Sequence, residues 1–206
     1  MMLHKTFLFE DDIINMFDDD KNLIRGHSYS GKTEFLIDLA NNLVDAGSKV
    51  FFISTKDENV YHRNKFTFHR SLSNRFEEDY KMFQLVSEII IRDNYDYLFI
   101  DDIDSIYDDH FFSNKQIDKF LEILINTPVK KILTCDWEES IDLPITSKTS
   151  AILFSNIREY YLTKKYNEDL GKSELFIRKN YNGENELTTD VIKKTIRDIK
   201  IENILK

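Results

Sequence analysis

The residues with the clearest chemical potential form a short run near the N-terminal end of the chain, from Gly26 to Thr33. The run fits the pattern G-x-x-x-x-G-K-[ST], in which backbone N–H groups and a lysine bind phosphate groups. Its two glycines let the backbone approach phosphate oxygens closely, where a Cβ atom would clash. They are two of only five glycines in the chain, which argues against a chance match in a turn. We therefore expect ATP to bind through Gly26, His27, Ser28, Tyr29, Ser30, Gly31, Lys32 and Thr33.

The last two residues of this run have separate roles in that interpretation. Lys32 is expected to neutralise the β and γ phosphates, and the hydroxyl of Thr33 to coordinate Mg²⁺. Such an ion also needs a carboxylate beyond the end of a neighbouring strand. The apolar run 97–100 predicts a buried strand, so Asp101 should hold the ion at the carboxyl edge of a sheet. Asp102 could then act as general base on the attacking water. A solvated strand end with turn-forming acids is the alternative.

Other polar residues are secondary candidates for the same site. Thr134 ends the next predicted strand, where a sensor of the γ-phosphate or of water would lie, and this interpretation rests on strand position alone. Glu58 is a second candidate for the catalytic base. We expect Asp104, Asp108 and Asp109 to be solvated loop charges and not metal ligands.

Apolar runs alternate with amphipathic segments over most of the chain, which predicts an α/β fold. Short continuous apolar runs predict buried strands, and apolar stripes spaced three and four residues apart predict helices. Strands of this kind between helices are typical of a parallel sheet with both faces covered. The expected strands are 23–24, 49–55, 97–100 and 131–134, and the expected helices are 32–46, 79–93 and 114–126.

The last third of the chain predicts a different arrangement. Residues 151–155 predict another strand. Residues 174–179 and 186–189 predict a C-terminal β-hairpin around an Asn182-Gly183 turn. From Thr189 onward we expect a closing helix, over residues 190–206. The chain as a whole, residues 1–206, is expected to be a single P-loop NTPase domain, with residues 1–21 as a short lead.

With these residues placed, the chain resembles a RecA-type P-loop ATPase. The likeness is to the ATPase domain of DnaB-type replicative helicases, over residues 22–190. It is carried by GHSYSGKTEFLIDLANNLVDAGSKVFFIS, SAILFSNIREYY and ELFIRKNYNG. The last segment resembles a hairpin that reaches a neighbouring subunit's nucleotide, with Lys179 on its lysine and Gly183 on its glycine. The resemblance implies a RecA-like, mainly parallel sheet flanked by helices, and an ATPase acting in DNA replication or recombination.

Three positions depart from that family's pattern. Its catalytic glutamate falls at Lys56, its hairpin arginine at Tyr181, and the glutamine after its fourth strand at Cys135. Lys179 or Arg178 must then supply the charge from a neighbouring subunit, or nothing does. Because a lysine lacks the bidentate fork of an arginine, we expect slow hydrolysis, stimulated by DNA or a partner, and a homo-oligomer whose assembly is weak or depends on nucleotide, DNA or a partner.

Other function classes stay open. FIDDID and KILTCD resemble the initiator and helicase-loader clade of AAA+ ATPases, which would have a helical bundle over residues 174–189 in place of strand, turn and strand. A nucleotide-dependent accessory switch with little hydrolysis is another alternative. A small-molecule kinase ranks last, because only Arg158 and Arg178 could serve as lid arginines near the phosphates.

Partners are constrained by charge. The formal net charge of −9 argues against a broad nucleic-acid surface. The segment from Tyr61 to Arg75 interleaves cations with aromatic residues and is the best candidate for binding single-stranded DNA. A loop whose aromatic residues dock on the core is the alternative. The five histidines have no metal-ligand spacing, and Cys135 is expected to be a small buried residue.

The single cysteine excludes an internal disulfide, and no apolar run reaches the length of a membrane span. We therefore expect a soluble, cytoplasmic protein. The abundance of Asn, Ile, Lys, Phe and Tyr indicates AT-rich codons, which suggests a viral or phage source and hence the host cytoplasm.

Overall fold

The computed structural model describes residues 17–54, 66–70, 75–107, 112–136, 147–167, 172–179 and 189–191. None of the helices in these segments has the length and apolarity that crossing a membrane requires. The predicted lead, except for its last residues 17–21, lies outside the described residues, and so does the part of the predicted closing helix from residue 192 onward.

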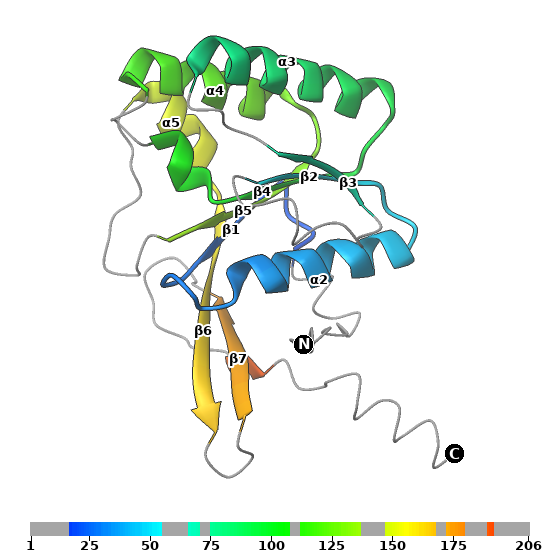
Figure 1. Ribbon diagram of the computed structural model, residues 1–206, viewed down its shortest axis with the longest axis vertical. Coiled ribbons are helices and arrows are strands. Elements are labelled where there is room, and N and C mark those ends of the chain that lie inside the picture. The colour runs from blue at the N-terminus through cyan, green and yellow to red at the C-terminus, as the bar shows by residue number, and fades with distance from the viewer. Residues whose placement is uncertain are drawn as a thin grey trace.

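In the part of the chain that the structure describes, an eight-stranded sheet forms the centre of the fold (Figure 1). Its strands are β1 (Lys21–Arg25), β2 (Val50–Ser54), β3 (Thr67–Arg70), β4 (Tyr97–Asp101), β5 (Lys130–Cys135), β6 (Arg158–Asn167), β7 (Lys172–Lys179) and β8 (Thr189–Val191). Across the sheet they are ordered β3-β2-β4-β5-β1-β6-β7-β8. Neighbours from β3 to β6 pair in parallel, whereas β7 pairs antiparallel with both β6 and β8. The predicted α/β fold with a mainly parallel sheet is confirmed.

Helices cover both faces of this sheet. They are α2 (Lys32–Asp45), α3 (Phe76–Arg92), α4 (Asn114–Asn126) and α5 (Lys148–Phe154), and a 3-10 turn, η2 (Ile103–Tyr107), follows β4. In Figure 1, α2 lies on one face, and α3, α4 and α5 lie on the other. The central strands are therefore enclosed on both sides, which explains why β2 and β4 are buried at all five of their positions.

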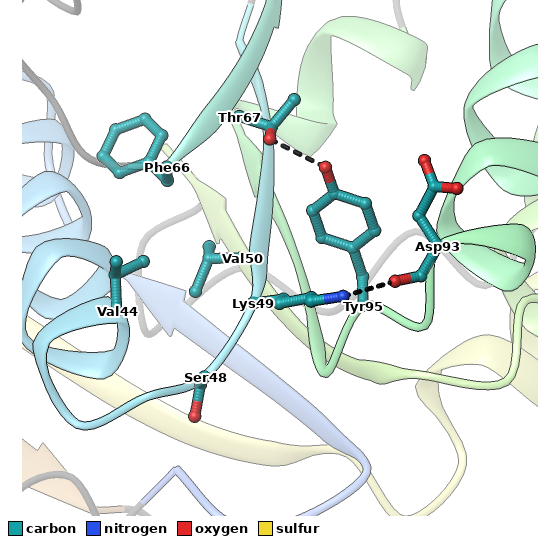
Figure 2. Close-up of a pocket in the computed structure, with 8 residues that line it drawn as sticks. All are labelled: Val44, Ser48, Lys49, Val50, Phe66, Thr67, Asp93 and Tyr95. Atoms are coloured by element: carbon teal, nitrogen blue, oxygen red, sulfur yellow. Dashed lines mark hydrogen bonds between the residues drawn. The ribbon is translucent and has the colours of Figure 1, made fainter.

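A cavity of about 280 Å³ opens beside the amino ends of β2, β3 and β4 (Figure 2). Hydrogen bonds join residues that line it: Lys49 Nζ donates to the Asp93 carbonyl at 2.9 Å, and the hydroxyls of Thr67 and Tyr95 lie 2.7 Å apart. Ligands of parallel α/β sheets bind at the carboxyl ends of the strands. The cavity lies at the opposite edge, so it is not part of the predicted nucleotide site.

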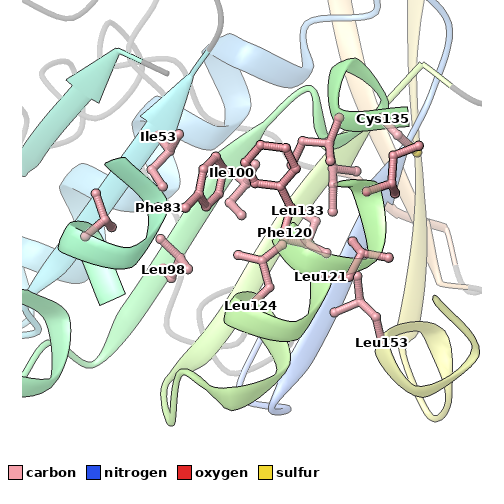
Figure 3. Packing of buried hydrophobic residues seen from close by; sticks show 14 of the residues in the cluster. Ile53, Phe83, Leu98, Ile100, Phe120, Leu121, Leu124, Leu133, Cys135 and Leu153 are labelled. Carbon is pink, nitrogen blue, oxygen red and sulfur yellow. The ribbon is translucent and has the colours of Figure 1, made fainter. Parts of the chain in front are cut away.

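Two apolar clusters join the helices to the sheet. On the α2 face, Leu36 belongs to the same cluster as Phe52 and Tyr160. On the opposite face, the rings of Phe83 and Phe120 meet edge to face with centroids 5.1 Å apart, and this cluster joins α3, α4 and α5 to the strands (Figure 3). The strands contribute side chains to both clusters. The carboxyl ends of β1, β4 and β5 are therefore held in fixed positions relative to one another.

The prediction of a strand over residues 151–155 is wrong. These residues lie in and just beyond α5, which begins after Ser147. The Ser147 hydroxyl accepts from the Ser150 backbone N–H at 3.1 Å, and the Ser150 hydroxyl accepts from the Ser147 N–H at 2.9 Å. Each serine satisfies a backbone donor of the other, so this reciprocal cap starts a helix where the apolar run alone suggested a strand.

The C-terminal strands differ from the prediction in extent. β6 was not expected as a strand, yet it pairs in parallel with β1 and antiparallel with β7. β8 occupies Thr189–Val191, where a closing helix was predicted to start. The antiparallel pairing of β7 with β8 is the arrangement that favours a RecA-type over an AAA+ fold. The Asn182-Gly183 turn lies outside the described residues.

Part of the predicted DNA-binding segment belongs to the sheet. β3 adds a parallel edge strand beside β2. Phe66, directly before it, is buried and stacks on Phe52 with ring centroids 4.8 Å apart. For this one aromatic residue, the core-docking alternative is correct. Residues 61–65 and 71–74 lie outside the described residues.

Candidate nucleotide-binding site

The motif from Gly26 to Thr33 covers the loop between β1 and α2 and the first two residues of α2, as expected. Gly31 has φ 93° and precedes the first residue of α2, a conformation that a residue with a Cβ rarely adopts. Gly26 is needed for a different reason: a Cβ there would lie 2.5 Å from the Leu162 carbonyl oxygen of β6. The first glycine thus lets the loop pass against the neighbouring strand. Tyr29, also in the left-handed region at φ 64°, is 98% exposed.

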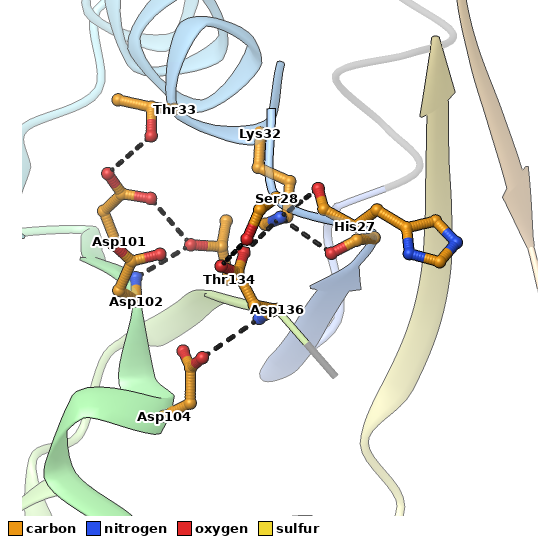
Figure 4. A network of polar contacts seen from close by, with 10 residues as sticks. His27, Ser28, Lys32, Thr33, Asp101, Asp102, Asp104, Thr134 and Asp136 are labelled. Atoms are coloured by element: carbon orange, nitrogen blue, oxygen red, sulfur yellow. Dashed lines mark hydrogen bonds and ion pairs between the residues drawn. The ribbon is translucent and has the colours of Figure 1, made fainter. Parts of the chain in front are cut away.

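Lys32 is nearly buried, and its ammonium group is held inside the loop. Its Nζ donates to the carbonyl oxygens of Gly26 at 2.7 Å and His27 at 2.9 Å. It also forms an ion pair with Asp136 Oδ1 at 2.5 Å (Figure 4). The predicted phosphate-binding lysine therefore lies at the carboxyl edge of the sheet, and there it already contacts an anionic group.

Asp101 is fully buried at the end of β4, directly opposite this loop. Its Oδ2 accepts from the Thr33 hydroxyl at 2.9 Å and from the Ser54 hydroxyl at 3.4 Å. Its Oδ1 accepts from the Thr134 hydroxyl at 2.8 Å. The structure thus brings together the two predicted magnesium ligands, and it adds hydroxyl groups from the ends of β2 and β5.

These oxygen atoms fit a magnesium ion. Mg²⁺ prefers carboxylate, hydroxyl, phosphate and water oxygens, and it usually takes only one or two ligands from the protein when it accompanies a nucleotide. Thr33 and Asp101 supply such a pair. Within the described segments, no group of three or more His, Cys, Asp or Glu side chains could hold a metal by itself. The ion would therefore depend on the nucleotide's phosphates for its remaining ligands.

Asp102 and Thr134 lie next to this pair. Asp102 is half-buried with φ 66°, and its backbone N–H donates to the Thr134 hydroxyl at 2.9 Å. Thr134 therefore links the backbone of Asp102 to the carboxylate of Asp101. The strand-end position predicted for Thr134 is correct, and in this structure its hydroxyl contacts both Asp101 and Asp102.

Asp104 differs from the prediction of a solvated loop charge. It lies in η2 and is half-buried, and burial raises the pKa of its carboxyl group. Its Oδ2 accepts from the Asp136 backbone N–H at 3.2 Å. The 3-10 turn after β4 folds Asp104 back toward the end of β5, which the composition of this acidic stretch could not show. Asp108 and Asp109 lie outside the described residues.

Asp136 was not among the predicted site residues. It directly follows β5 and contacts two residues of the phosphate-binding loop. Besides the ion pair with Lys32, its Oδ2 accepts from the Ser28 hydroxyl at 2.6 Å. Its position in the sequence could have indicated this role, because it lies two residues beyond Thr134, at the end of a strand that pairs with β1.

An ion pair between the buried Arg25 and the half-buried Glu159 lies beneath the loop, between β1 and β6. Arg25, directly before Gly26, is 3% exposed. Its guanidinium donates to Glu159 Oε2 at 2.8 Å and to the Tyr161 hydroxyl at 3.1 Å, and it lies over the Tyr161 ring at 5.3 Å. These contacts fix the last residue of β1 against β6, so they position the start of the loop.

Several predicted residues are not brought into the described site. Glu58, Lys56 and Tyr181 lie outside the described residues. Arg178 and Lys179 are in β7, opposite Tyr161 and Tyr160 of β6. Cys135 is buried at the end of β5, as expected for a small apolar residue.

Comparison with a known structure supports the fold. A KaiC-like protein from the hyperthermophilic archaeon Pyrococcus horikoshii OT3 superposes with a TM-score of 0.55 and 15% identity, covering 85% of this chain and 83% of that one. At this identity the likeness concerns the fold alone. It agrees with the predicted RecA-like P-loop NTPase fold, whereas a DnaB-type helicase in particular is not supported.

Comparison at the level of sequence identifies the family. No curated protein sequence matches the chain. The family model described as thymidine kinase matches residues 21–140, from the first residue of β1 to beyond β5. This range is more than half of the chain, and it contains the phosphate-binding loop, Asp101, Asp102, Thr134 and Asp136. The protein is a nucleotide-binding P-loop protein, and the chain belongs to the thymidine kinase family.

Proposed function

We propose that the protein binds ATP with Mg²⁺ and transfers the γ-phosphoryl group to a hydroxyl group of a nucleoside. One observation carries the proposal: the Thr33 hydroxyl at the start of α2 and the buried Asp101 carboxylate at the end of β4 lie 2.9 Å apart, next to Lys32. The loop supplies the cation and the N–H groups for the phosphates, and the pair supplies oxygen ligands for the metal.

The chemistry assigns a role to each side chain. An oxygen of the acceptor hydroxyl bonds to the γ-phosphorus, the bond from that phosphorus to the β–γ bridging oxygen breaks, and ADP leaves. The acceptor's proton passes to a carboxylate, for which Asp102 is the candidate. Lys32 balances the charge on the phosphates. Mg²⁺, which Thr33 and Asp101 would hold, would further neutralise the charge of the phosphates when bound.

The choice of a nucleoside as acceptor comes from the family. The thymidine kinase model covers the whole run of strands that carries the site, so thymidine is the first acceptor to test. The family match supports the kinase alternative, which the sequence analysis ranked last for its scarcity of lid arginines, and we therefore test it first.

A second candidate is ATP hydrolysis with water as the acceptor, in a motor or switch for DNA replication. The observation that favours it is the RecA-like arrangement of the sheet, with antiparallel strands after β6. In this case Asp102 would activate water. Partners would then include single-stranded DNA near residues 61–75, further copies of the chain, or a replication protein.

One assay separates the two candidates. The protein is incubated with Mg²⁺ and ATP labelled on the γ-phosphorus, with thymidine, with other nucleosides, with single-stranded DNA, or with none. Label in a nucleoside monophosphate supports the kinase. Label only in inorganic phosphate, with a rate raised by DNA, supports the ATPase. If no label is transferred and Mg²⁺-ATP does not bind, both candidates fail.

A further inference from the structure

We propose that Asp136 takes the place of the γ-phosphate on Lys32, so that the site distinguishes a nucleoside triphosphate from a diphosphate. The inference rests on the proposed function, because it concerns the same phosphate-binding loop. It starts from the ion pair between Lys32 Nζ and Asp136 Oδ1, in which an anionic group of the protein already contacts the cation that the phosphates require.

The hydrogen-bonding capacity of Lys32 is the first step. An ammonium group has three N–H donors. The Lys32 donors meet the carbonyl oxygens of Gly26 and His27 and the carboxylate of Asp136. The two carbonyl contacts lie within the loop itself and can remain when a nucleotide binds. A γ-phosphate oxygen therefore competes for the donor that Asp136 uses.

The Asp136 carboxylate also contacts the loop through separate oxygen atoms, as a bound phosphate would. Its two oxygens contact two different residues of the loop, Oδ1 at Lys32 and Oδ2 at the Ser28 hydroxyl. A phosphate group bound to such a loop likewise places separate oxygens on the lysine and on loop donors. Asp136 is thus an anionic substitute with two points of contact, and like charges prevent it and a γ-phosphate from sharing Lys32 at close range.

Backbone contacts keep Asp136 close to Lys32, where its carboxylate and a γ-phosphate can replace one another. Its N–H donates to Asp104 Oδ2 at 3.2 Å, and two residues earlier Thr134 binds Asp101 (Figure 4). The side chain of Asp136 is 40% exposed, so it can leave Lys32 for solvent without burying a charge. When the γ-phosphate is absent or has been transferred, the carboxylate can return.

A binding experiment tests this role of Asp136. The dissociation constants of Mg²⁺-ADP and of a Mg²⁺-bound non-hydrolysable ATP analogue are measured by calorimetry for the full chain and for Asp136→Asn. Loss of the competing charge should tighten binding of the analogue about fivefold, as expected for a partly exposed ion pair. Binding of ADP, which leaves the γ position to Asp136, should change less than twofold.

Two variants serve as controls. Asp136→Glu keeps the negative charge and should restore the preference of the original chain. Asp93→Asn removes an equal charge at the opposite edge of the sheet and should leave both dissociation constants unchanged. If Asp136→Asn alters the binding of both nucleotides equally, or weakens the analogue, Asp136 does not act in place of the γ-phosphate. If the unaltered chain binds neither nucleotide, the proposed function itself is wrong, and the inference with it.

Discussion

The Asp101 carboxylate accepts hydrogen bonds from three hydroxyl groups, those of Thr33 at the start of α2, Ser54 at the end of β2 and Thr134 near the end of β5. A buried carboxylate is costly unless its oxygens are hydrogen-bonded, and these contacts meet that requirement. They also hold the carboxylate beside the loop that binds phosphate. The proposed metal-binding role of Asp101 and its structural role therefore rest on the same carboxylate.

Replacing Asp101 with Asn should raise the magnesium concentration needed for nucleotide binding. The amide keeps the size of the side chain but removes the negative charge that attracts the ion. A titration of Mg²⁺ at fixed ATP analogue should give a half-maximal concentration about tenfold higher, if the carboxylate's contact with the ion is worth about 1.4 kcal/mol more than the amide's. Asp45→Asn, at the end of α2, is the matched control. An unaltered magnesium requirement in Asp101→Asn would remove this residue from the metal site.

Replacing Asp102 with Asn should keep nucleotide binding and slow turnover. Loss of a general base usually lowers the rate about 10²-fold or more. The dissociation constant of the ATP analogue and kcat are measured on the same preparation. A kcat equal to that of the unaltered chain would show that another carboxylate is the base, with Glu58 the next residue to substitute.

Part of this site could be predicted residue by residue. The loop motif and the apolar strand before Asp101 were sufficient to place Thr33 and Asp101 together, because parallel strands bring their carboxyl ends to one edge. Asp104 and Asp136 could not be placed in this way. Their side-chain directions depend on the 3-10 turn after β4 and on the chain leaving β5, and neither has a periodic signal.

At the scale of elements, the pairing of β1 with β6 positions the phosphate-binding loop. Arg25 at the end of β1 is buried against Glu159 and Tyr161 of β6, and Gly26 then passes the Leu162 carbonyl. Glu159→Ala removes the carboxylate that accepts from the Arg25 guanidinium, so the free energy of unfolding should fall by about 1.5–3 kcal/mol. Urea denaturation of the unaltered chain and of Glu159→Ala measures this change in the free energy of unfolding.

The matched control for this change is Glu122→Ala, on the exposed side of α4. An exposed substitution of this kind should alter the free energy of unfolding by about 0.5 kcal/mol or less. If Glu159→Ala is no more destabilising than Glu122→Ala, the pair does not contribute to holding β1 against β6.

The junction between α4 and β5 makes stability depend on pH. Lys131 Nζ donates to the carbonyl oxygens of Thr127 and Val129, and burial lowers the pKa of Lys131 from 10.5 to about 8. Between these two values the unfolded chain binds a proton that the folded chain does not. The contribution of Lys131 to the free energy of unfolding therefore rises as pH rises from 8 to 10.5.

Lys131→Met provides the comparison, because methionine keeps the apolar length and does not titrate. The free energy of unfolding of the unaltered chain minus that of Lys131→Met should rise between pH 8 and 10.5. Urea denaturation at several pH values measures this difference. A difference that is constant over the window would show that the lysine is not desolvated in the folded protein.

The elements that sequence predicted well are those with a clear period or a recognisable end. α4 has an apolar stripe, and its Ser113–Gln116 capping box fixes its start, so the predicted bounds match the observed ones. The short apolar run 151–155 has no such period, and only the Ser147 cap distinguishes it as a helix. β6 was missed because its pairing with β1 is a long-range contact that local residues do not encode.

At the scale of the whole molecule, the functional groups gather at one edge of the sheet. β1, β4 and β5 are neighbours in space but are separated in the chain by helices on both faces. This order brings the loop, Asp101 and Asp136 together at the carboxyl edge. The cavity beside Tyr95 lies at the amino edge, so any ligand there would not meet the phosphates.

The central claim is that the loop between β1 and α2 binds a nucleoside triphosphate through Lys32. Calorimetric titration of Lys32→Ala with a Mg²⁺-bound, non-hydrolysable ATP analogue tests it directly, and Lys115→Ala on the exposed side of α4 is the matched control. Loss of a charge-assisted contact worth about 1.5–3 kcal/mol predicts binding weakened about tenfold or more. The control should bind like the unaltered chain. Equal affinity in Lys32→Ala and the unaltered chain would contradict the account.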